Sequence, residues 1–78
     1  MSTVKEIKAK AITIKPSIRP GCFILDPPVA LRCTTDLGDI TKGEIVHAVS
    51  IDECGSYPDA VHLKEKAYWW YASYFEIQ

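Results

Sequence analysis

The residues that most constrain the fold lie near the C-terminal end, where six of the eight residues from Tyr68 to Phe75 are aromatic. The segment 44–51 before them alternates its side chains regularly and is the clearest strand of the sequence. Its two faces are Ile45, His47, Val49 and Ile51 on one side, and Val46, Ala48 and Ser50 on the other. Both faces are largely apolar, so we expect something to cover each of them. Aromatic and β-branched residues favour strands, and the C-terminal half therefore predicts β structure.

Short segments separated by turn residues continue this pattern on both sides. We expect strands at 29–35, 60–63 and 67–71, a hairpin turn at 64–66, a single 3₁₀ turn at 72–74 and a last short strand at 75–77. Prolines at 16, 20, 27 and 28 predict that residues 15–28 hold no long regular element, with at most a short strand at 22–25. About five short, closely spaced strands indicate an all-β barrel or sandwich.

The first fifteen residues fit two patterns. Val4, Ile7 and Ala11 form a helical stripe, whereas residues 9–14 alternate like a strand whose phase slips after Ala11. The slip indicates either a bulge or a change of element. Because residues 12–14 are all β-branched, we expect a strand over residues 9–14.

Length and cysteine spacing limit the class of protein. A chain of 78 residues forms one domain with a small core. No apolar run is long enough to span a bilayer and the first residues lack the apolar region of a signal peptide, so we expect a soluble cytoplasmic protein. The three cysteines, Cys22, Cys33 and Cys54, contain no close pair, which favours reduced thiols over a disulfide framework.

Charge is divided unevenly along the chain. Residues 1–21 carry five basic residues against one acid, and residues 22–78 carry nine acids against four basic residues. The sequence therefore predicts a basic leader attached to an acidic body.

The order of these segments resembles the Src-homology-3-like barrel. Residues 40–45, Ile-Thr-Lys-Gly-Glu-Ile, resemble the turn before its core strand, and residues 71–75, Tyr-Ala-Ser-Tyr-Phe, resemble its closing element. The Thr-Lys-Gly turn with a terminal Tyr-Phe-Glu is also similar to small barrel proteins encoded by bacteriophages. The resemblance implies a barrel over residues 29–78. Residues 1–28 then form a basic N-terminal extension that packs on the barrel or pairs with it.

The chain departs from the peptide-binding members of this family. They carry two tyrosines in an Ala-Leu-Tyr-Asp-Tyr segment, where this chain has Ala-Leu-Arg-Cys-Thr at residues 30–34. Tyr71 replaces the proline of the closing element, Tyr74 fits a groove aromatic, and Tyr57 stands in for the groove tryptophan. Recognition of polyproline helices needs parallel aromatic ridges, so their loss disfavours binding of proline-rich segments.

The aromatic run is the first candidate for a binding surface. Strand alternation sends Tyr68 and Trp70 to one side, Trp69 and Tyr71 to the other. The resemblance implies that Trp70 and Phe75 belong to the core, which leaves Trp69, Tyr71 and Tyr74, with Tyr57, as an exposed patch suited to a protein partner. The alternative is that the basic leader folds over this face and buries it.

The acids of two loops are the second candidate. Asp36 and Asp39 lie in the first loop, and Asp52, Glu53 and Asp59 in the second. The resemblance places both loops on one rim beside the aromatic patch. An acidic rim around exposed aromatics suits a basic protein surface or an arginine-containing segment. The alternative is an ordinary solvated surface.

Other chemistries find little support. The cysteines together with His47 and His62 would suffice for zinc by number, but they lack the close spacing of zinc sites, and His47 fits a packed strand position. Neither a phosphate-binding loop nor a nucleophile with its base is recognisable, so we expect no cofactor, no metal and no enzyme.

We therefore expect a non-enzymatic protein-interaction module, in the manner of a phage factor that binds and modulates a host protein. The alternative is a nucleic-acid-binding barrel that contacts phosphates through its basic leader, which the acidic body disfavours. Self-association through an exposed edge strand at residues 9–14 is a third hypothesis.

Overall fold

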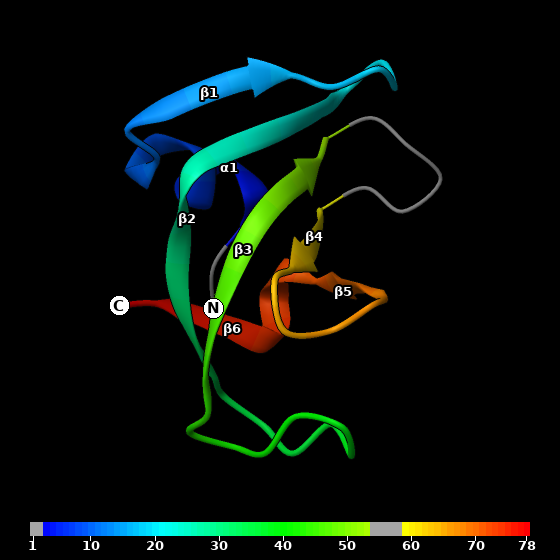
Figure 1. Cartoon of the computed structure of the whole chain (residues 1–78). Helices are drawn as coiled ribbons and strands as arrows, with labels where there is room; N and C mark the ends of the chain where they lie inside the picture. Colours follow the sequence, from blue (N-terminus) through cyan, green and yellow to red (C-terminus); the bar gives the residue numbers. More distant parts are fainter. Residues whose placement is uncertain (1–2, 54–58) are drawn as a thin grey trace.

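The computed structural model describes residues 3–53 and 59–78, and these form a single antiparallel sheet with one short helix (Figure 1). In chain order the elements are α1 (Val4–Lys10), β1 (Thr13–Pro16), β2 (Cys22–Cys33), β3 (Ile45–Asp52), β4 (Ala60–Leu63), β5 (Trp69–Tyr71), the 3₁₀ turn η1 (Ala72–Tyr74) and β6 (Phe75–Ile77). The predicted all-β class is confirmed.

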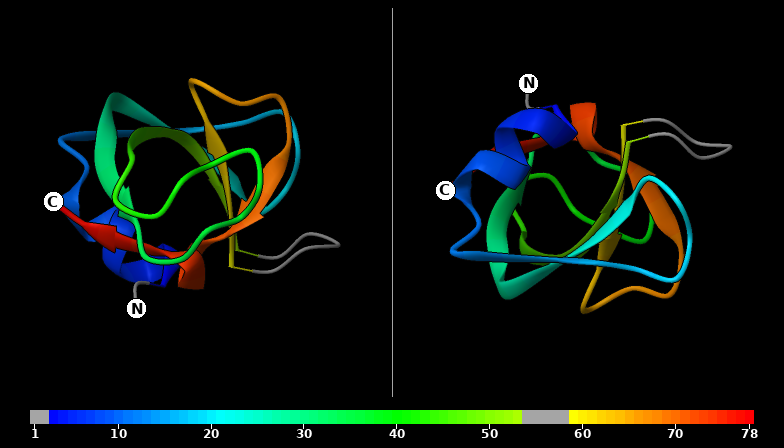
Figure 2. Two further views of the ribbon diagram at one scale, coloured as in Figure 1. Left: turned by 90° about the horizontal axis from the view of Figure 1, so that it is seen from below. Right: turned by 90° about the horizontal axis from the view of Figure 1, so that it is seen from above.

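The sheet is strongly curved and its ends stay apart. Its strands follow the order β1-β2-β3-β4-β5, and β6 pairs with β2 further along the edge that also receives β1. Among the described residues, β1 and β5, at the two ends of this path, do not pair with each other. The strands wrap around the interior, with α1 lying across one end of it (Figure 2).

The N-terminal strand predicted at residues 9–14 is wrong, because residues 4–10 form a helix and β1 begins at Thr13. A capping box starts the helix: the Thr3 hydroxyl accepts from the Glu6 N–H, and the Glu6 carboxylate accepts from the Thr3 N–H. Val4 and Ile7 are buried on the inner face. The phase slip in the sequence therefore marks a change of element, and the helical stripe was the correct pattern.

The prolines do not divide the second strand, contrary to prediction. β2 runs from Cys22 to Cys33 and includes Pro27 and Pro28, with a cis peptide bond between Asp26 and Pro27. Its pairing with β3 shifts register between Ile24 and Val29. The prolines lie in this irregular stretch, where the ladder needs no N–H donor from them.

The C-terminal half follows its prediction closely. The 3₁₀ turn and the strands at 60–63 and 75–77 have the predicted bounds, β3 begins and ends one residue later than expected, and β5 is two residues shorter. The predicted faces of β3 hold as far as Ala48. A register shift against β4 follows, and Ile51 is buried on the same side as Val46 and Ala48.

One hydrophobic core fills the inside of the curved sheet. Its buried members are Val4, Ile7, Leu25, Val29, Leu31, Cys33, Ile40, Val46, Ala48, Ile51, Val61, Leu63, Ala72 and Phe75. The helix and the sheet thus contribute to the same cluster. The thiols of Cys22 and Cys33 are buried and free. In the described part of the chain, no helix has both the length and the apolar character that crossing a bilayer requires.

Candidate interaction site

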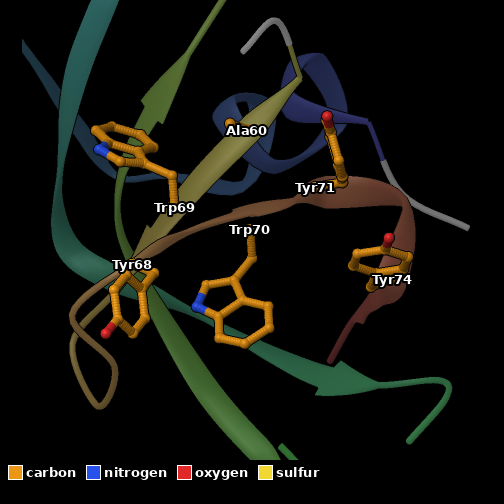
Figure 3. Close-up of a pocket in the computed structure, with 6 residues that line it drawn as sticks. All are labelled: Ala60, Tyr68, Trp69, Trp70, Tyr71 and Tyr74. Carbon is orange, nitrogen blue, oxygen red and sulfur yellow. The ribbon is translucent and has the colours of Figure 1, made fainter. Parts of the chain in front are cut away.

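An aromatic groove of about 450 Å³ runs along β5 and the 3₁₀ turn (Figure 3). Its lining residues are Ala60, Tyr68, Trp69, Trp70, Tyr71 and Tyr74. The side chains of Tyr68 and Tyr71 are 69% and 49% exposed, and the other three aromatics are partly buried. Of the predicted patch, Tyr71 is exposed and Trp69 and Tyr74 are partly buried; Tyr68, the other exposed ring of the groove, was not among the predicted residues.

Strand geometry distributes these rings. Trp69 and Trp70 leave β5 on opposite sides, and Tyr71 lies on the side of Trp69 (Figure 3). The Tyr71 and Tyr74 rings meet edge to face with their centroids 5.9 Å apart, because the 3₁₀ turn brings the second tyrosine back beside the first. Phe75 is fully buried, as predicted, whereas Trp70 packs against the core and is only partly buried.

The basic leader reaches one end of the groove. Arg19, in the turn between β1 and β2, lies with its guanidinium 6.0 Å from the centre of the Trp69 ring. The His62 ring packs against the same indole at 5.4 Å. Trp69 is thus partly covered, while Tyr68 and Tyr71 remain exposed. The leader covers part of the aromatic face and leaves the rest open.

The acids do not share one rim, and that part of the prediction is wrong. β2 and β3 are antiparallel, so the loop with Asp36 and Asp39 lies at one end of this pair and Asp52 at the other (Figure 1). Asp52 is also not a loop residue: it belongs to β3, is 2% exposed, and accepts a hydrogen bond from Arg19 at 3.2 Å. Glu53 forms an ion pair with Lys8 at 2.9 Å.

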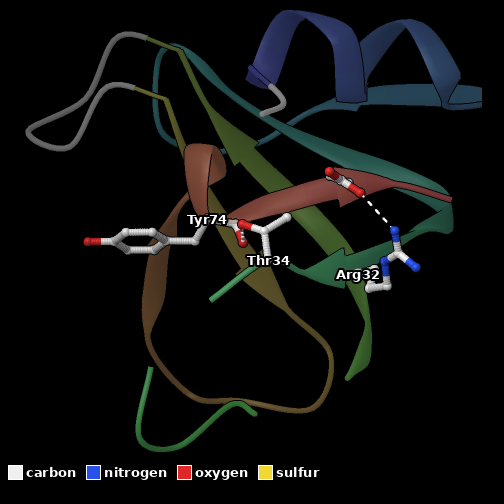
Figure 4. A network of polar contacts seen from close by, with 4 residues as sticks. Arg32, Thr34 and Tyr74 are labelled. Carbon is white, nitrogen blue, oxygen red and sulfur yellow. Dashed lines mark hydrogen bonds and ion pairs between the residues drawn. The ribbon is translucent and has the colours of Figure 1, made fainter. Parts of the chain in front are cut away.

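Three of the five predicted acids, Asp36, Asp39 and Asp59, are exposed, and the groove lies between them. The Asp59 carbonyl accepts from the Ala72 N–H at 2.7 Å, which places this residue beside the start of the 3₁₀ turn. At the end of that turn, the N–H and the hydroxyl of Thr34 donate to the Tyr74 carbonyl at 2.8 and 2.9 Å (Figure 4). Thr34 begins the loop that carries Asp36 and Asp39. Both acidic segments therefore adjoin the aromatic turn, one at each end.

The predicted contacts and the lining of the groove differ at three residues. Tyr57, a predicted contact, lies outside the described residues. Tyr68 and Trp70 line the groove although they were not predicted to contact a partner. Tyr68 follows the polar hairpin turn, and a large aromatic at the end of a turn is a signal that could have identified it. Trp70 was assigned to the core by resemblance.

The basic side chains of the leader are largely engaged within the molecule. Lys8 pairs with Glu53 and lies 3.9 Å from the centre of the Phe23 ring. Arg19 pairs with Asp52, and Lys15 lies 3.9 Å from the carboxylate of Asp26 in an exposed pair. These pairs indicate that the leader neutralises acids of the body.

The Cys22 thiol is the most distinctive titratable group near these pairs. Burial raises its pKa above the usual value, and the neighbouring Asp52 carboxylate raises it further, while Arg19 opposes the change. The thiol is therefore protonated at neutral pH and is a poor nucleophile. Over residues 3–53 and 59–78, no three acidic, histidine or cysteine side chains gather in a way that could hold a metal ion.

Comparison with known proteins gives the chain no family. The sequence matches no protein-family model, and neither a curated protein nor a solved structure matches the chain. A functional conclusion therefore rests on the groove and the charged residues around it.

Proposed function

We propose that the chain is a non-enzymatic protein-interaction module that binds a basic segment of a partner protein in the aromatic groove. The observation that carries this proposal is the exposure of Tyr68 and Tyr71 beside partly buried Trp69 and Trp70. Tyrosine and tryptophan provide large contact areas at low entropic cost, and they dominate the energetics of protein interfaces.

Charge supports a basic partner. Asp36, Asp39 and Asp59 are exposed, and none of them takes part in an ion pair within the described part of the chain. Carboxylates at both ends of an aromatic groove attract arginine and lysine side chains, and the rings themselves favour guanidinium groups through cation–π contacts.

We also propose that the fold is a Src-homology-3-like barrel. The order of strands β2 to β6 and the 3₁₀ turn between the last two strands support this assignment. The resemblance to such barrels also implies a binding groove beside the 3₁₀ turn. The missing tyrosines at residues 32 and 34 keep proline-rich ligands disfavoured.

Binding of nucleic acid through the leader is the weaker alternative. Lys8 and Arg19 are held by Glu53 and by the buried Asp52, so engaging phosphates would require breaking these pairs. Retention on single-stranded nucleic acid at low salt, lost steeply as salt is added, would favour this alternative.

The test is a titration of the full chain, followed by NMR, with a capped heptapeptide that alternates arginine and valine. We expect the indole N–H signals of Trp69 and Trp70 to shift on binding. Tyr71→Ala should weaken binding by roughly fivefold or more, because truncation of a central aromatic typically costs over about 1 kcal/mol. It should lower stability by only about 1 kcal/mol, because the residue is half exposed and its main contact within the molecule is the edge-to-face one with Tyr74.

Two controls make this result specific. Ile12→Ala removes a side chain that is 82% exposed and outside the groove, and should leave binding unchanged. The same heptapeptide with glutamate in place of arginine should not bind. Equal binding of both peptides, or equal loss with both alanine variants, contradicts the proposal.

A further inference from the structure

The groove follows a free strand edge. β5 is the last strand on the path of the sheet and pairs with β4 on one side. No other strand of the described residues pairs with its second edge. An unpaired edge offers backbone donors and acceptors to another chain.

The hydrogen-bonding pattern shows which backbone groups face this edge. Opposite residues of an antiparallel pair alternate between hydrogen-bonded and non-hydrogen-bonded pairs. Ala72 donates to the carbonyl directly opposite, that of Asp59, so this is a hydrogen-bonded pair. Trp70, two residues before Ala72, is of the same type and turns its backbone groups toward β4. The intervening residues Trp69 and Tyr71 therefore turn theirs outward.

Three of the outward groups are available. The Tyr71 carbonyl is used inside the molecule, since this residue caps the 3₁₀ turn. The N–H and C=O of Trp69 and the N–H of Tyr71 make no hydrogen bond within residues 3–53 and 59–78. Two donors and one acceptor at alternate positions are what one added strand would satisfy.

Aromatic walls stand on both sides of this edge. Trp69 and Tyr71 rise on one side, and Trp70 extends on the other (Figure 3). Successive side chains of an extended peptide also point to opposite sides. A strand placed on the edge would therefore contact both walls alternately while its backbone pairs with β5.

We propose that β5 binds its partner by strand addition: an extended, basic segment of the partner protein pairs with the edge at Trp69 and Tyr71. The inference rests on the proposed function, because exposed Asp36, Asp39 and Asp59 make a basic protein segment the complementary occupant. Backbone pairing supplies affinity, and the two walls select the alternate side chains.

The first test measures backbone amide exchange in the full chain with and without the arginine–valine heptapeptide. Free, the amides of Trp69 and Tyr71 should exchange quickly and that of Trp70 slowly, because only the last is bonded to β4. Saturating peptide should slow exchange of the first two by about tenfold or more, which reflects their new hydrogen bonds.

The second test removes one backbone donor. Tyr71 has φ of −68°, which proline adopts without strain, and its N–H makes no bond in the sheet. Tyr71→Pro and Tyr71→Ala both remove the aromatic ring, but only the proline variant also removes the backbone N–H. We expect equal stability for the two variants, and peptide binding about three- to tenfold weaker for the proline variant, the usual effect of one hydrogen bond.

The outcomes separate the two proposals. If the peptide shifts the indole signals but leaves exchange at Trp69 and Tyr71 unchanged, the groove binds side chains only and strand addition is overturned. If no peptide shifts the indoles, the proposed function fails as well. Tighter binding of a proline-rich peptide, or protection that rises with protein concentration without peptide, would overturn strand addition in favour of a polyproline helix or a second copy of the chain. A proline variant that unfolds would show that the Tyr71 N–H is bonded internally.

Discussion

The N-terminal segment, residues 3–26, and the aromatic segment, residues 68–74, use their side chains in opposite ways. The first buries Val4 and Ile7 in the core and directs Lys8 and Arg19 to acids of the body. The second leaves large rings in solvent, including Tyr71 at 49% exposure. The difference shows that basic side chains of this molecule form internal contacts, whereas two of its aromatic side chains are exposed to solvent.

The two segments meet in the shared core and also at one aromatic ring on the surface, that of Trp69. The Arg19 guanidinium lies over Trp69 and donates to buried Asp52, so one side chain links the leader, the end of β3 and the groove. This junction divides the aromatic segment into a covered part and an open part. Tyr68 and Tyr71 belong to the open part.

The largest expected effect on stability comes from weakening the contact between the helix and the core, and it tests whether the N-terminal segment is part of the folded body. Ile7→Ala deletes a fully buried side chain and should lower the free energy of unfolding by about 2–5 kcal/mol in urea. Ile12→Ala, at a position that is 82% exposed, should cost less than about 0.5 kcal/mol. A loss below about 1 kcal/mol for the first variant would make the leader an independent extension.

A smaller effect is expected from the ion pairs, and it sharpens the comparison. Arg19→Ala takes a charged partner from the buried carboxylate of Asp52 and should cost about 1–2 kcal/mol, discounted because the arginine is half exposed. Arg32→Ala breaks a pair with Glu76 in which both side chains are about half exposed (Figure 4), and should cost about 0–1 kcal/mol. Tryptophan fluorescence should change for the first variant, which uncovers Trp69. Equal losses of stability for the two variants would show that the burial of Asp52 does not strengthen its ion pair.

The regular, local elements were predictable from the sequence. Alternation predicted most of β3, and the short segments 60–63, 72–74 and 75–77 predicted β4, the 3₁₀ turn and β6 with their bounds. The Thr3–Glu6 capping box was present in the sequence and would have favoured a helix over a strand at residues 4–10. The helical stripe of Val4 and Ile7 was visible too, but the β-branched residues 12–14 outweighed it.

Features that depend on tertiary contacts were not predictable. Nothing local indicates that β2 continues through Pro27, because this depends on a register shift against β3. The positions of the acids depend on which end of a strand each loop joins, and the burial of Asp52 depends on Arg19, 33 residues away in sequence. The aromatic surface was predicted from strand alternation together with the family resemblance, but the free edge beneath it requires the sheet order.

The smallest expected effect concerns the one acid that ties the turn before the groove to the body. The Glu65 carboxylate accepts from the backbone N–H of His47 at 2.9 Å and from its ring Nδ1–H. The backbone N–H of Lys64 donates to the His47 carbonyl at 2.8 Å. Partial burial opposes ionisation of Glu65, but the hydrogen bonds from His47 outweigh it and lower the pKa below its ordinary value of 4.5.

A pKa that folding lowers contributes stability above the ordinary value, and this stability is lost as the pH falls through the folded pKa. We therefore expect Glu65→Gln to cost at most about 1 kcal/mol at neutral pH, because the pair is partly exposed. The difference from the unmodified chain should vanish in acid, as followed by urea unfolding across the pH range. A difference that persists well below pH 4.5 would mean that the carboxylate's shape, and not its charge, holds the turn. Tyr68 follows this turn and lines the groove, so the variant should also weaken peptide binding. The ion pairs of Lys8 and Arg19 should stay intact, so the N-terminal segment should keep its contacts while the aromatic segment loses affinity.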